Sequence, residues 1–370
     1  MSSKLPILAG GLLLAAGLAA GLWFSIGPGE SASSQGKDYR YLSTRDLQQL
    51  SVRLGGTGLV KPTGDVEEFT LVAQQVEWEL LPGVMTMADT FNGTVPGPTI
   101  RVTEGDTVRV TVNNELPQET SVHWHGLHVP NEMDGVAGVT QDPIMPGETF
   151  TYEFIASHAG TFMYHSHSRF SREQIDRGLY GVLIIDPQKP ERPRFDREYT
   201  LALQGWMVGA DMGDGAAMGM DYNYFTINGK SFPATEPLVV EEGDVVRVRL
   251  LNPSQTIHPM HLHGQDFKVV AKDGEPLKEP FIANTLDVEQ GETYDIVFIA
   301  NNPGVWAFHC HDLHHTANDG VEPGGLMVLV QYEGYEPVGG TDQQSMDQES
   351  TGQESTGQES MPAQMPGMMH

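Results

Sequence analysis

The seven residues His309–His315, in the order His-Cys-His-Asp-Leu-His-His, contain the only cysteine of this 370-residue chain. An apolar run precedes them and predicts a β-strand, in which successive side chains point to opposite faces. His309 and His311 would then share one face, while Cys310 points to the other. A thiolate with two imidazoles is the ligand set of a blue copper site, and His315 can supply an imidazole on the Cys310 side. One strand is therefore predicted to serve two metal sites.

Three further His-x-His pairs accompany the cysteine run. Of the 14 histidines, 13 lie between residues 123 and 315, and most fall into four tight groups. The other pairs are His123 with His125, His165 with His167, and His261 with His263, the last preceded by His258. Each pair places two imidazoles on one face of an extended segment. A lone buried cysteine is commonly a small apolar residue, but four such groups together favour metal binding.

These motifs resemble those of the multicopper oxidases, the laccase-like family, in order as well as in composition, over roughly residues 65 to 333. The resemblance implies four copper ions per subunit. His258, Cys310 and His315 are similar to the ligands of the type 1 copper, and His123 and His261 to those of the type 2 copper. The expected type 3 ligands are His125, His165, His167, His263, His309 and His311.

The resemblance also implies the reaction. A phenolic or other aromatic reductant would give single electrons to the type 1 site, and Cys310 would connect that site to the three-copper cluster through its neighbours His309 and His311. There, dioxygen would be reduced to water by four electrons. Copper carries the difficult chemistry, and the protein supplies geometry and potential.

Two positions near the ligands are informative. The residue five positions beyond His315, where the family has its axial type 1 ligand, is Gly320, and Met327 is the nearest methionine. Because Met327 lies in an apolar run, core packing is its expected role. Asp134, followed by Gly135, matches the position of a family proton-relay acid, although an Asp-Gly pair is equally typical of a turn.

Repeated turn and strand signals predict an all-β fold with two domains. The alternating segments 107–112 and 245–250 each follow an acidic Gly-Asp turn and precede a Gly-Glu-Thr turn, at 147–149 and 291–293. The family implies cupredoxin-type Greek-key β-sandwiches. We expect the first domain at 66–187 and the second at 195–335, after a signal peptide or membrane anchor at 1–36 and a linker at 37–65, and before a disordered tail at 336–370.

The division of motifs between the domains predicts an assembly. The first two histidine pairs lie in the first domain, and the last two groups lie in the second. The two-domain laccases that these motifs resemble form homotrimers, in which the first domain of one subunit meets the second domain of the next. We therefore expect a homotrimer with copper clusters between its subunits.

The amino-acid composition limits where the protein can be located and which partners it can bind. The stretch 5–29 is uncharged, which predicts export or anchoring, so the catalytic part would lie outside the cytoplasmic membrane. A net charge of −28 argues against nucleic-acid binding and is consistent with a halophilic source. Methionines gather at 207–220 and 361–369, and because thioethers bind Cu(I), a cuprous or other metal-ion oxidase for copper tolerance is an alternative function.

Two other classes remain as alternatives. A copper nitrite reductase also has two cupredoxin domains, but its type 1 cysteine lies in the first domain and it has few His-x-His pairs. A simple electron-transfer protein would need no histidines beyond a type 1 site. The number of copper ions per chain separates these classes: four for the oxidase, two for the reductase and one for the carrier.

Overall fold

The computed structural model describes residues 62, 64–189, 194–209 and 222–338, all of which belong to one compact unit. The predicted N-terminal export segment, most of its linker, the methionines at 212–220 and most of the C-terminal tail lie outside the described residues. None of the helices in the described part has both the length and the apolar composition needed to cross a lipid bilayer.

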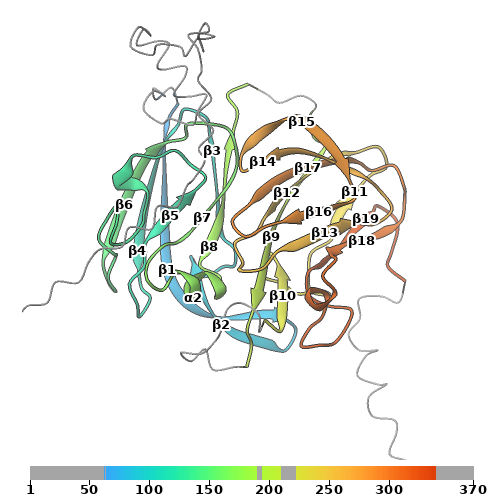
Figure 1. Ribbon diagram of the computed structural model, residues 1–370, viewed down its shortest axis with the longest axis horizontal. Helices are drawn as coiled ribbons and strands as arrows, with labels where there is room; N and C mark the ends of the chain where they lie inside the picture. Colours follow the sequence, from blue (N-terminus) through green and yellow to red (C-terminus); the bar gives the residue numbers. More distant parts are fainter. Residues whose placement is uncertain (1–61, 63, 190–193, 210–221, 339–370) are drawn as a thin grey trace, which may run out of the picture. The chain divides into compact units, whose positions relative to one another are not determined.

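The first domain is a sandwich of two four-stranded sheets, with strand orders β2-β1-β4-β6 and β3-β8-β7-β5 (Figure 1). Its elements are β1 Val66–Leu81, β2 Val84–Phe91, β3 Gly97–Thr103, β4 Thr107–Asn114, β5 Val122–His125, η2 Asn131–Met133, β6 Thr149–Ile155, β7 Gly160–Ser166, α2 Ser171–Asp176 and β8 Tyr180–Asp186. The strand predicted at 107–112 is confirmed in β4, where every second residue is buried. These buried residues pack on Trp124 and Tyr152 in the core between the sheets.

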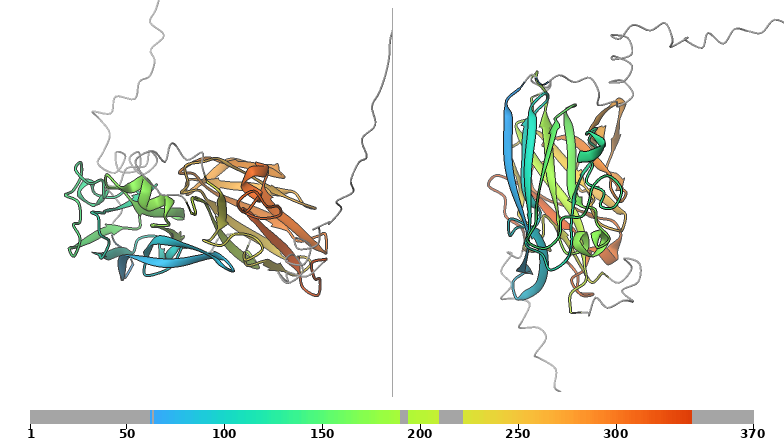
Figure 2. Two further views of the ribbon diagram at one scale, coloured as in Figure 1. Left: turned by 90° about the horizontal axis from the view of Figure 1, so that it is seen from below. Right: turned by 90° about the vertical axis from the view of Figure 1, so that its left-hand side faces the viewer.

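The second domain is a sandwich with strand orders β10-β9-β12-β17-β14-β15 and β11-β19-β18-β13-β16. Figure 2 shows its strands from two further directions. Its elements are β9 Arg197–Trp206, β10 Tyr224–Ile227, β11 Leu238–Val240, β12 Val245–Leu251, β13 His258–Leu262, β14 Phe267–Lys272, β15 Glu275–Ala283, β16 Thr285–Val288, β17 Thr293–Ile299, β18 Val305–Cys310, η3 Leu313–Thr316 and β19 Met327–Tyr332. The predicted strand at 245–250 is confirmed in β12.

The predicted all-β, two-domain cupredoxin fold is confirmed. A third apolar cluster joins the domains, with Met163 and Tyr180 from the first and Trp206 and Leu251 from the second. The packing of β8 against the second domain explains why its sequence is an almost continuous apolar run: six of its seven residues are buried. One face of β8 packs in its own sandwich and the other packs against the second domain, so neither face needs polar residues.

Candidate metal centres

The cysteine lies in a buried group with two histidines, which we call the thiol site (His258, Cys310 and His315). His258 begins β13, Cys310 ends β18, and His315 lies in η3. The Nδ1 atom of His315 lies 3.4 Å from the Cys310 Sγ and 3.2 Å from Nδ1 of His258. The ligand atoms of all three residues lie within 4.8 Å of one another. A single ion can therefore contact one sulfur and two nitrogens here, which is the donor set that suits blue copper.

Burial favours uncharged donor groups at the thiol site. It lowers the pKa of His315 to about 4 and that of His258 well below its usual range, so both imidazoles keep a free lone pair at neutral pH. Burial also raises the pKa of the Cys310 thiol to about 12. The thiol then keeps its proton until a cation takes the proton's place.

Apolar groups cover this site. The ring of Phe225 lies 4.2 Å from that of His315, centroid to centroid, and Leu326 is fully buried in the same cluster as Cys310.

The Nε2 atom of His258 hydrogen-bonds the Ser254 hydroxyl at 2.9 Å. This hydrogen bond orients the ring so that Nδ1 faces the sulfur.

The first domain gathers its four ligand-pattern histidines into one group, the first-domain half-site (His123, His125, His165 and His167). His123 and His165 are opposite each other in the register of β5 with β7, and Nδ1 of His125 lies 3.1 Å from Nε2 of His165. His123 donates its Nδ1–H to the backbone oxygen of Asp134 at 2.8 Å, and His165 donates in the same way to Ser166. These hydrogen bonds leave Nε2 of each ring available to a metal.

The second domain forms a matching group, the second-domain half-site (His261, His263, His309 and His311). His261 and His309 are opposite each other in the register of β13 with β18, and Nε2 of His263 lies 2.9 Å from Nε2 of His309. His261 donates its Nδ1–H to the backbone oxygen of Asn284 at 2.8 Å. The rings of His309 and His311 stack at 5.9 Å, so they share one face as the strand alternation predicted.

The ring contacts of the half-site histidines lie within each half-site. In the part of the chain that the structure describes, ring contacts join the members of each half-site, and none joins a histidine of one half-site to a histidine of the other. Instead, His125 faces the turn between β16 and β17, where a Cβ on Gly291 would lie 3.2 Å from its Cε1.

All eleven predicted ligand residues therefore fall into these three groups. Asp134 lies where the sequence predicted an acid beside the ligands, with its Oδ1 3.4 Å from Nδ1 of His123. No sequence motif indicated Gly291, Asn284 and Phe225, which come from turns and strands without histidine motifs. Their contacts follow from packing between segments far apart in the chain, so local spacing carries no signal of them.

Neither Gly320 nor Met327 directs a side chain toward the thiol site. Gly320 has left-handed backbone geometry (φ 79°) in the loop after His315, and it has no side chain that could approach the thiol site. Met327 pairs with His309 in the register of β18 with β19, so its side chain lies on the His309 face. The residue opposite Cys310 is Leu326, whose carbonyl accepts the Cys310 N–H at 2.9 Å. Leu326 is thus the side chain placed to cover the thiol site.

Comparison with known proteins agrees with this geometry. Residues 72–190 and 210–321 match two family models, both described as multicopper oxidase. The solved structure of the multicopper oxidase mgLAC is 40% identical and has a TM-score of 0.70, and the match covers 74% of this chain and 88% of that one. The chain belongs to the multicopper oxidase family, which binds copper.

Curated relatives differ in what their names say. Copper resistance protein A homolog of Pseudomonas syringae pv. tomato is 29% identical over 283 residues, or 62% of this chain and 47% of the relative. Laccase-2 of Botryotinia fuckeliana is 35% identical over 272 residues, or 64% of this chain and 45% of the relative. The chain thus spans about half the length of the curated relatives it matches.

Proposed function

We propose that the protein is a laccase-like multicopper oxidase, which takes single electrons from a phenolic or aromatic reductant and reduces dioxygen to water. One observation carries the proposal: Cys310 belongs to the thiol site, while its sequence neighbours His309 and His311 belong to the second-domain half-site. The peptide bonds on either side of Cys310 therefore connect the thiol site directly to two histidines of the second-domain half-site. A simple electron carrier has no use for this connection.

In this proposal the thiol site holds the type 1 copper. His123 and His261 hold the type 2 copper, and His125, His165, His167, His263, His309 and His311 hold the type 3 pair. The residues fit copper, because a thiolate with two imidazoles suits one blue centre and grouped imidazoles suit the others. When bound, the four ions supply the one-electron transfers and the binding of dioxygen.

The chain's own residues would guide reductant and protons. His315 uses Nδ1 toward the sulfur, so its Nε2 remains for contact with a reductant, and the carboxylate of Asp312 lies 3.6 Å from that atom. An exposed carboxylate here can accept a hydrogen bond from a phenol hydroxyl. Asp134, beside His123, is placed to pass protons to the half-site.

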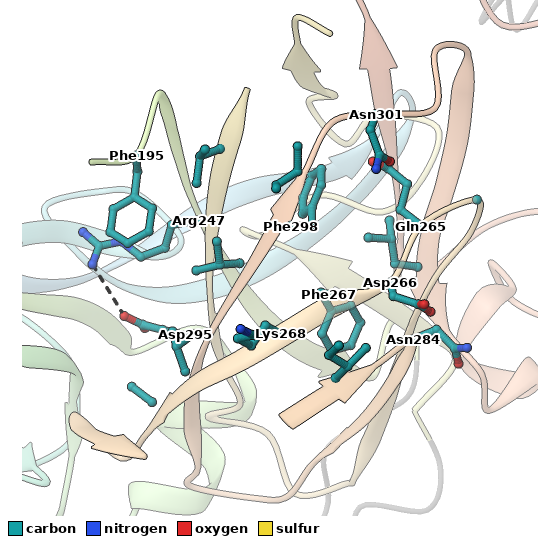
Figure 3. A pocket seen from close by; sticks show the side chains of 18 of the residues that line it. Phe195, Arg247, Gln265, Asp266, Phe267, Lys268, Asn284, Asp295, Phe298 and Asn301 are labelled. Atoms are coloured by element: carbon teal, nitrogen blue, oxygen red, sulfur yellow. Dashed lines mark ion pairs between the residues drawn. The ribbon is translucent and has the colours of Figure 1, made fainter. Parts of the chain in front are cut away.

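The absence of ring contacts between the half-sites, among the described residues, supports the proposal that a second copy completes each cluster. Beside His261 and His263 the second domain has a groove of about 1210 Å³. Figure 3 shows Phe267, Phe298 and Lys268 among its lining residues. We propose that the first domain of a neighbouring subunit docks here, so that His123 and its group face His261 and its group. A closed head-to-tail ring of three subunits satisfies every such contact.

Two further properties belong to the proposal. The uncharged N-terminal stretch supports export or anchoring outside the cytoplasmic membrane, and the net charge of −28 supports a salt-adapted source. Oxidation of Cu(I) is the second candidate reaction, favoured by the similarity to copper resistance protein A.

Metal analysis of the purified protein tests the class. We expect four copper ions per chain; two would support a nitrite reductase and one an electron carrier. Cys310→Ser should remove the blue thiolate absorption and dioxygen consumption but keep copper on the half-sites. His128→Gln, which changes a histidine outside the ligand pattern, is the control. Full turnover by Cys310→Ser would overturn the proposal.

Complementation tests the assembly. One variant carries His165→Ala in the first-domain half-site, and another carries His263→Ala in the second-domain half-site. Each should be inactive alone. When the two are co-expressed in equal amounts, about a quarter of the subunit contacts should join two intact half-sites and recover that share of the activity. No recovery, in co-assembled and copper-loaded protein, would place the cluster within one chain instead.

The reductant is tested by steady-state comparison. Dioxygen consumption is measured with a phenol, Cu(I), Fe(II) and Mn(II), in the full chain and in a chain ending at residue 338. A higher kcat/KM with the phenol supports the laccase-like reaction. A higher kcat/KM with Cu(I) supports the cuprous alternative.

A further inference from the structure

The β1–β2 hairpin has an outer face that carries no residue of the histidine motifs. The parallel pairing of β1 with β4 ends at Ala73, and beyond it β1 pairs only with β2. The inner face of this two-stranded ribbon packs into the apolar cluster between the domains, through Leu80 and Ala88. Side chains alternate along each strand, so the residues between these positions form a second, outward face.

That outward face carries two methionines and two glutamates. Met85 and Met87 are 49% and 48% exposed, and Glu77 and Glu79 are exposed as well. The register places Glu77 opposite Met87 and Glu79 opposite Met85. Cβ atoms of directly opposite residues are about 5 Å apart and those two apart on one strand are about 7 Å apart. Two carboxylates along β1 and two thioethers along β2 therefore form the corners of a small square, which we call the Met–Glu patch.

The ribbon under this patch is firmly anchored. The indole N–H of Trp78, on the inner face, donates to the backbone oxygen of Gly229 at 2.7 Å, and the Ser231 N–H donates to the oxygen of Leu80 at 2.9 Å. On the patch itself, one carboxylate oxygen of Glu79 accepts the Gly83 N–H at 3.0 Å. The backbone positions of the four side chains are thus fixed before any ligand arrives.

Nothing in the fold requires thioethers at these positions. A β-ribbon favours β-branched or aromatic residues, and methionine mostly fills gaps in cores, whereas Met85 and Met87 fill none. Thioether sulfur is a soft donor that selects Cu(I), and adjacent carboxylates add attraction for a cation.

We propose that the Met–Glu patch binds a soft monovalent cation, Cu(I), through the sulfur atoms of Met85 and Met87, with Glu77 and Glu79 supplying negative charge. The patch shares no residue with the thiol site or with either half-site. The binding itself does not depend on turnover; under the cuprous alternative of the proposed function, the patch would collect the substrate.

Silver ion tests this proposal, because Ag(I) is a soft monovalent cation that the oxidase cannot oxidise further. The copper-loaded full chain, labelled at the methionine methyl groups, is titrated with Ag(I) and followed by NMR. Resonances are assigned with Met85→Leu and Met87→Leu, which conserve volume. Met145→Leu is the matched control, because Met145 is a single methionine that is 43% exposed.

We expect the Met85 and Met87 methyl signals to shift together, at about tenfold lower Ag(I) concentration than the Met145 signal. Met85→Leu should weaken the response of Met87, and Glu77→Gln with Glu79→Gln should weaken both. Responses of Met85 and Met87 at the same concentration as Met145, or independent of each other, would overturn the proposal. The Cys310→Ser variant should bind Ag(I) at the Met–Glu patch as tightly as the protein with Cys310 does. A failure of the oxidase proposal would therefore not change this result.

Discussion

The surroundings of the Cys310 sulfur depend on which face each side chain of β19 takes. Phe308, Cys310, Leu326 and Val328 are buried together, while Met327 is half-buried opposite His309. The Met327 side chain is therefore directed away from the Cys310 sulfur, and the aliphatic side chain of Leu326 covers that sulfur. An apolar covering without an axial donor is expected to raise the potential of a type 1 copper.

Exchanging the two side chains tests this assignment. Leu326→Met should place a thioether near the copper and lower the type 1 potential, because an axial donor stabilises Cu(II). Met327→Leu should leave the potential and the blue absorption unchanged. Redox titration of the blue band measures both variants. A shift in Met327→Leu that equals the shift in Leu326→Met would show that β19 has the opposite orientation.

The sequence predicted the grouping of the ligand residues but not the axial one, for a physical reason. Ligands on one strand are fixed by alternation, so spacing alone places His309 and His311 together. The axial residue follows a ten-residue loop, which Asn318 closes by accepting the Gly325 N–H at 2.9 Å and donating to the Phe232 oxygen at 2.7 Å. Counting positions from His315 cannot predict where such a loop returns.

At the scale of elements, two glycine turns of the second domain have similar backbones and different surroundings. Gly243 and Gly291 lie in turns that the sequence repeat predicted, with φ angles of 99° and 80°. A Cβ on Gly243 would contact nothing within 4 Å, while one on Gly291 would lie against His125. The repeat thus predicted the turns but not that one of them contacts the first-domain half-site.

The pair of variants Gly291→Ala and Gly243→Ala separates backbone strain from this contact. Both should lose stability, by about 1 kcal/mol, because alanine is strained at positive φ. Only Gly291→Ala should also lower dioxygen consumption, since the added methyl group presses on a proposed type 3 ligand. Thermal unfolding and turnover are measured in parallel. Equal loss of turnover in both variants would mean that the turn does not position His125.

At the scale of the whole molecule, a buried ion network holds the domains together. Arg249 is 3% exposed; it donates to Asp295 at 3.0 Å and to Glu198 at 3.1 Å, and it also donates to the hydroxyl of Thr161 in the first domain. The sequence predicted two domains but not this interface, because Arg249 stands in a strand whose local pattern suggested an exposed polar position.

Arg249→Met should destabilise the protein by about 2–3 kcal/mol, because it removes the guanidinium nearest to the buried Asp295 and leaves Arg247, at 3.9 Å, to neutralise that carboxylate. Arg109→Met is the control: Arg109 pairs with Glu68 and Glu153 at the surface, so its loss should cost less than about 1 kcal/mol. Chemical unfolding gives both free energies. Similar values for the two variants would show that the interdomain network contributes no more than surface pairs.

A second interdomain contact should make stability depend on pH. Asp176, in α2 of the first domain, accepts a hydrogen bond from the Tyr222 hydroxyl of the second at 2.7 Å. Burial raises the pKa of Asp176 from its usual 3.8 to about 6. Since the folded-state pKa is raised, the carboxyl's contribution to stability is complete below about pH 4 and is lost as the pH rises through 6.

Asp176→Asn cannot ionise, and its side-chain oxygen can still accept the Tyr222 hydrogen bond. As the pH rises from 4 to 8, the stability of this variant relative to the unchanged protein should increase by on the order of 2 kcal/mol. Asp142→Asn, at an exposed position, removes the same charge from the surface and should gain much less. Unfolding free energies of the three proteins are compared at both pH values. If Asp176→Asn gained no more than Asp142→Asn, the buried carboxylate would be as well solvated as a surface one, and the contact between α2 and Tyr222 would be open to water.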